Sequence, residues 1–111
     1  MDLKRSIKAK PDEFVALCRT HDVDTLYVFG SSTSDRFDEA KSDIDLLVEL
    51  KTEDPVERGE KLMDLWEKFE MFFQRKVDLL TNKSLRNPIL KKSIDASKIL
   101  IYDGQRQEVS F

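Results

Sequence analysis

Cysteine and long apolar runs are nearly absent from this chain. Cys18 is the single cysteine, so no internal disulfide can form, and a reducing compartment such as the cytoplasm is expected. No apolar run approaches the roughly 20 residues that a membrane-spanning helix needs. The first ten residues, MDLKRSIKAK, lack an apolar centre, so no secretory signal is expected. We therefore expect a cytoplasmic protein with no membrane contact.

An excess of positive charge is also missing. The chain has 19 Lys and Arg against 22 Asp and Glu, which gives a formal net charge of -3. A protein that grips long nucleic acid by its phosphates is normally basic, because cationic side chains neutralise the phosphates. The acidic balance therefore counts against DNA as a partner. It does not exclude binding of a small nucleotide, because metal ions can neutralise the charge of its phosphates.

The composition and the grouping of apolar residues indicate one folded domain. Hydrophobic residues make up 40% of the 111 residues and charged residues 37%. The apolar residues fall in periodic blocks, as in a soluble globular chain. We see no repeat, linker or low-complexity stretch. We expect a domain over residues 1–103 and a flexible tail over residues 104–111.

Strand-like and helix-like segments alternate along the chain. Asp54, Pro55 and Glu57 form a capping-box pattern that predicts the start of the clearest helix. The predicted helices are residues 11–21, a short one from 31 to 37, 55–73 and 84–95, and the predicted strands are 25–29, 43–50, 76–81 and 98–102. This order predicts an α/β (α+β) domain with a small mixed sheet of about four strands and helices mainly on one face.

Three aspartates occupy two of the predicted strands. Asp43 and Asp45 are separated by one residue, so their carboxylates point to the same face of the strand. Asp78 lies in an apolar strand, where an acid is costly unless it is paired, exposed or bound to metal. If these strands are neighbours, the three carboxylates can hold Mg²⁺ beside a phosphate, with Asp78 also placed to accept a proton.

A Gly-Ser pair follows the first predicted strand. Gly30 lets the backbone approach a phosphate closely, and Ser31 opens the next segment with free amides and a hydroxyl that can donate to anionic oxygens. Each feature also has a simpler explanation: a turn for Gly30-Ser31, a solvated strand edge for Asp43 and Asp45, and an exposed or ion-paired acid for Asp78. The combination favours a triphosphate site.

The segments FGSSTSDRFDEAKSDIDLLVEL and KVDLL resemble the minimal nucleotidyltransferase (MNT) family of the DNA polymerase beta-like superfamily. The matching positions are Gly30, Ser31, Asp43, Asp45 and Asp78. The resemblance covers about residues 22–102 and implies a nucleotidyltransferase fold that uses Mg²⁺ and ATP. Family members often carry basic residues after Gly-Ser, whereas here Arg36 is the single nearby basic candidate for nucleotide binding.

The resemblance also implies a partner. Many family members are encoded beside a helical HEPN toxin and act as its antitoxin, and some transfer AMP from ATP to a tyrosine on that toxin. A Mg-dependent transfer of AMP to a hydroxyl of a HEPN-type partner is thus the leading hypothesis. The alternative is a non-catalytic binding module that neutralises a helical partner by contact. Homo-oligomerisation stays open.

Overall fold

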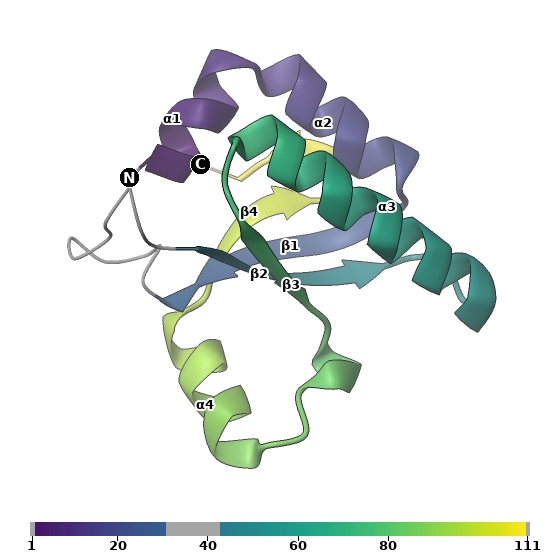
Figure 1. The fold of residues 1–111 in the computed structure, drawn as a ribbon, viewed down its shortest axis with the longest axis vertical. Helices are drawn as coiled ribbons and strands as arrows, with labels where there is room; N and C mark the ends of the chain where they lie inside the picture. The colour runs from purple at the N-terminus through teal and green to yellow at the C-terminus, as the bar shows by residue number, and fades with distance from the viewer. Residues whose placement is uncertain (1, 31–42, 111) are drawn as a thin grey trace.

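The computed structural model describes residues 2–30 and 43–110 (Figure 1). In chain order the elements are α1 (Asp2–Ala9), α2 (Pro11–Thr20), β1 (Val23–Phe29), β2 (Ile44–Leu50), α3 (Pro55–Phe73), β3 (Val77–Leu80), the 3₁₀ turn η2 (Asn82–Ser84), α4 (Pro88–Ser97), β4 (Ile99–Asp103) and β5 (Glu108–Val109). None of the described helices combines the length and the apolar character needed to cross a membrane.

The strands form one mixed sheet in the order β3-β2-β1-β4-β5. β2 and β3 are parallel, and the other neighbouring strands are antiparallel. The sheet has five strands rather than about four, and the predicted mixed α+β fold is confirmed.

Helices cover the two faces of the sheet unequally. α1, α2 and α3 lie over one face, and α4 lies on the other (Figure 1). The larger core forms under the first three helices, because alternate strand residues such as Leu26, Leu46 and Val77 point toward them. A smaller cluster of Phe29, Leu47 and Ile94 forms under α4. The prediction of helices mainly on one face is thus confirmed.

Aromatic rings fill the larger core. Phe14 of α2 is fully buried, and its ring centroid lies 6.0 Å from Phe69, 5.6 Å from Phe72 and 6.4 Å from Tyr102. Phe73 joins the cluster at 5.0 Å from Phe72. Rings at these separations add a favourable contribution beyond the apolar area that they bury. The cluster ties α2, α3 and β4 together.

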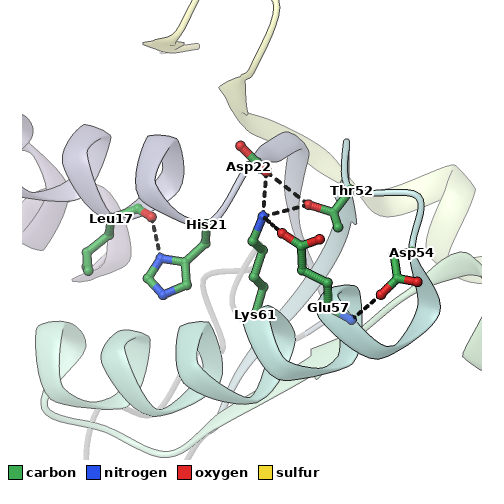
Figure 2. Close-up of polar contacts among 7 residues, drawn as sticks. All are labelled: Leu17, His21, Asp22, Thr52, Asp54, Glu57 and Lys61. Atoms are coloured by element: carbon green, nitrogen blue, oxygen red, sulfur yellow. Dashed lines mark hydrogen bonds and ion pairs between the residues drawn. The ribbon is translucent and has the colours of Figure 1, made fainter.

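Polar contacts fix the start of α3. The Asp54 side chain accepts a hydrogen bond from the backbone N–H of Glu57 at 2.9 Å, which confirms the predicted cap. Lys61 donates to Asp22 Oδ2 at 2.6 Å and to Thr52 Oγ1 at 2.9 Å (Figure 2). These contacts join α3 to the turn before β1 and to the end of β2.

His21 performs a structural role at the end of α2. Its Nδ1 lies 2.7 Å from the Leu17 carbonyl oxygen (Figure 2), and its Nε2 lies 2.6 Å from Asp64 Oδ2 on α3. The side chain is buried between the two helices. This single histidine therefore ends α2, as its position predicts, and fastens it to α3.

Several boundaries differ from the sequence prediction. α1 was not predicted, although its Leu3 and Ile7 are buried. α4 begins at Pro88 rather than at residue 84, because the Asn87 side chain caps the backbone amides of Ile89 and Leu90. The predicted helix at residues 31–37 and the loop after it lie outside the described residues.

The C-terminal segment also departs from its prediction. The sequence predicts a flexible tail over residues 104–111, but Glu108–Val109 forms β5 and pairs with β4. Gly104 is buried, and its N–H donates to the Asp24 carbonyl oxygen at 2.7 Å. Val109 packs against the larger core. The short turn after β4 folds this segment back onto the sheet.

Candidate active site

Asp45 and Asp78 occupy directly paired positions on two parallel strands. The register of β2 and β3 sets Ile44 opposite Val77 and Asp45 opposite Asp78. Paired residues of parallel strands point to the same face, so both carboxyl groups project from the face opposite the larger core. The two carboxyl groups are close enough for the charge of Asp78 to act on Asp45 and for a proton on one group to be shared with the other. The strands that carry Asp45 and Asp78 are therefore neighbours, as a shared metal site requires.

Asp43 immediately precedes β2. It is two residues from Asp45, which places it toward the same face of the sheet. Its charge acts on the Asp45 carboxyl group. The structure thus places all three predicted acids at one end of the β2–β3 pair, with Asp45 and Asp78 in contact.

The environment of Asp45 disfavours its charged form. Burial is the largest cause, and the neighbouring charges of Asp78 and Asp43 add to it, so that the pKa of Asp45 rises from 3.8 to about 6. A hydrogen bond with Asp78 acts in the same direction. A divalent cation at this point would remove the repulsion among the carboxylates.

Gly30 lies directly against this acid. Phe29, the last residue of β1, pairs with Asp45, and Gly30 follows with a φ of 71°. A Cβ atom added to Gly30 would lie 2.7 Å from Asp45 Oδ2. Both the left-handed backbone and this close approach favour glycine. Gly30 therefore forms the rim of the acidic site, while Ser31 and Arg36, the other two predicted nucleotide-binding residues, lie outside the described residues.

The donor chemistry suits magnesium. Mg²⁺ prefers oxygen ligands and commonly takes one or two carboxylates together with substrate phosphates. Asp45 and Asp78 supply such a pair. Within residues 2–30 and 43–110, no set of three or more His, Cys, Asp or Glu side chains is gathered closely enough to hold a metal ion. The Asp45–Asp78 pair is thus the centre of the candidate metal site, and substrate phosphate oxygens and water molecules would complete it.

An apolar wall borders the acids, which the sequence analysis missed. Phe29, Leu47 and Ile94 are buried together on this face, and Leu80 packs against them. Beside this wall, the Lys98 ammonium lies 4.5 Å from the centre of the Tyr27 ring. The alternation of β1 and β2 places Phe29 and Leu47 on the acidic face. Nothing in the sequence pattern shows that Ile94 of α4 crosses to that face.

Comparison with known proteins places this chain in a family. The family model for polymerase beta nucleotidyltransferases matches residues 13–107. A relative from Methanocaldococcus jannaschii, named "Putative protein adenylyltransferase MJ1379", is 37% identical over 79 residues, which span 71% of this chain and 77% of that protein. The chain therefore belongs to the polymerase beta nucleotidyltransferase family. It is a nucleotidyltransferase, as the sequence predicts.

Solved structures share the fold. A structure described as that of a "putative minimal nucleotidyltransferase" is 26% identical with a TM-score of 0.61, covering 89% of this chain and 95% of that one. A toxin-antitoxin structure with AMP-PNP is 21% identical with a TM-score of 0.62, covering 87% and 76%. A Shewanella oneidensis complex of a tri-AMPylated HEPN toxin with an MNT antitoxin is 20% identical with a TM-score of 0.52, covering 96% and 76%.

Proposed function

We propose that this protein transfers AMP from ATP to a hydroxyl group of a helical HEPN-type partner and thereby acts as its antitoxin in the cytoplasm. The contact of Asp45 with Asp78, made directly beside Gly30, carries this proposal. It is supported by the relative named as a protein adenylyltransferase and by the similar fold of an MNT antitoxin bound to an AMPylated toxin.

Each residue has a role in the proposed site. Asp45 and Asp78 would hold Mg²⁺, with Asp43 adding negative charge beside them. Gly30 and Ser31 would receive the phosphates, and Arg36 would face the triphosphate. The metal would supply charge neutralisation at the phosphates. The partner's hydroxyl oxygen attacks the α-phosphorus, the bond to pyrophosphate breaks, and the hydroxyl proton passes to Asp78.

Intact-protein mass spectrometry of the partner tests this function. The assay takes as partner a HEPN-type protein, sought among the products of neighbouring genes, and incubates it with ATP and Mg²⁺. Wild-type protein should add the mass of one or more AMP groups, and Asp45→Asn should add none while retaining its fold. The matched control is Asp12→Asn, which changes an exposed acid on α2 and should leave the transfer intact.

The same experiment separates the enzyme from a non-catalytic binding module. If neutralisation occurs by contact alone, Asp45→Asn will rescue growth of cells that express the partner as well as wild type does, with no mass change in either case. Such a result would contradict the proposed transfer. Loss of both the mass change and the rescue in Asp45→Asn would support it.

A further inference from the structure

An apolar groove lies outside the acidic site, between the first half of α3 and the edge of the sheet. Its volume is about 670 Å³. Its apolar lining includes Val56, Leu62, Met63, Trp66, Leu79 and Leu80. Val56 is 70% exposed and Met63 75%, and both lie in the lining of this one groove. Contiguous exposed apolar surface of this kind marks an interaction site more often than isolated residues do.

The groove follows an edge strand that α3 protects at one end. β3 is the outermost strand on its side of the sheet. Trp66 Nε1 donates to the Val77 carbonyl oxygen at 2.5 Å, and Glu70 accepts from the Val77 N–H at 3.0 Å. Beyond these contacts, Leu79 and Leu80 form the floor of the groove. The aspartates of the candidate active site do not line it.

A second surface of the same chain complements the groove. α4 exposes Ile89 to 80% and Leu90 to 46%. Lys92 is also exposed and follows Ile89 by three residues, so the two side chains share one face of the helix. The groove carries the opposite charge, because Glu60 belongs to its lining. An apolar ridge with a basic flank thus matches an apolar hollow with an acidic flank.

We propose that the groove binds α4 of a second copy of this chain. Ile89 of each copy lies in the hollow beside Met63 and Trp66 of the other, and Lys92 lies near Glu60. Ser84 at the groove and Pro88 at the start of α4 are close in sequence. A two-fold axis near this segment lets both contacts form at once and closes the assembly as a dimer.

Sedimentation velocity measurements on paired variants test the dimer. Met63→Glu places a charge in the groove and should raise the dimer dissociation constant by about tenfold or more, and Ile89→Glu should do the same. Met71→Glu is the matched control, because Met71 is 66% exposed on the same helix but does not line the groove. Thermal melts should show that all three variants fold, since each changed side chain is exposed.

A charge exchange identifies which surfaces meet. Glu60→Lys and Lys92→Glu should each weaken the dimer several-fold, and the double variant should regain part of the lost affinity. A wild type that remains monomeric at the highest soluble concentration would overturn the proposal and leave the groove to a different protein. Equal weakening by Met71→Glu, or no recovery in the double variant, would also overturn it.

Discussion

The two faces of the sheet carry opposite chemistry on the same strands. On one face, Leu46 and Val77 pack under the helices against a core that contains Phe14 and Phe69. On the other, Asp45 and Asp78 bring two carboxyl groups into contact on the same two strands. Because strand side chains alternate, one short strand can contribute to folding with one face and to chemistry with the other.

The difference between the faces has an energetic consequence. Each fully buried large apolar side chain contributes about 1.5–3 kcal/mol, so the helical face gains far more than the acidic face loses by repulsion. The acidic face can therefore be destabilising without unfolding the protein. Three substitutions test this division, and they follow in order of decreasing change in the free energy of unfolding.

Truncation on the helical face should have the largest effect. Phe69 is fully buried and contacts the rings of Phe14 and Phe73. Phe69→Ala should lower the free energy of unfolding by about 3–5 kcal/mol, because it removes apolar contacts and leaves a cavity. Urea denaturation measures the change. Met71→Ala, at an exposed position of the same helix, should stay within about 0.5 kcal/mol of wild type.

Substitution at the rim should cost less. Gly30→Ala should destabilise the protein by about 1–2 kcal/mol for its left-handed backbone, and the added Cβ should displace the Asp45 carboxylate. Gly59→Ala is the control, since a Cβ there meets no atom within 4 Å and Gly59 lies inside α3. It should stabilise the protein by about 0.5–1 kcal/mol. A lower melting temperature for Gly59→Ala than for Gly30→Ala would show that the backbone at Gly30 does not require glycine.

Removal of charge on the acidic face should have the smallest effect, with the opposite sign. In EDTA at pH 7, Asp45→Asn should stabilise the protein by up to about 1 kcal/mol once solvent screening of this half-buried carboxylate is allowed for. The raised pKa of Asp45, about 6, means that the protonated form favours folding. This contribution is fully present below 3.8, the unfolded pKa, and is lost as the pH rises through about 6.

The pH dependence supplies a direct check. The free energy of unfolding of wild type minus that of Asp45→Asn, measured by denaturation in EDTA, should decrease between pH 4 and pH 7. A difference that rises over this range would mean that Asp45 is a stabilising partner in an ion pair. The acidic face would then contribute to stability, contrary to the proposed division between the two faces.

The sequence predicts the parts of the fold that depend on local patterns. The apolar runs of β1 and β2 and the Asp54 cap of α3 are local patterns, and both strands and the cap are present in the structure. The N-terminal helix was missed because only Leu3 and Ile7 mark its apolar face. β5 was missed because a two-residue strand is defined by its pairing with β4 rather than by a pattern of its own.

The parts of the candidate site that depend on local spacing were also predictable. The spacing of Asp43 and Asp45 fixes their common face, and the apolar surroundings of Asp78 single it out. The pairing of Asp45 with Asp78 depends on strand order, which local sequence does not specify. The close approach of Gly30 to Asp45 likewise results from the antiparallel pairing of β1 with β2.

Titration calorimetry with ATP tests whether the acidic face binds a nucleotide through a metal ion. Wild type should bind ATP in Mg²⁺ and lose that binding in EDTA, because the carboxylates then repel the triphosphate. Asp45→Asn should remain folded and fail to bind ATP in either condition. Equal binding of ATP by wild type and Asp45→Asn, or equal binding with and without Mg²⁺, would contradict the proposed site.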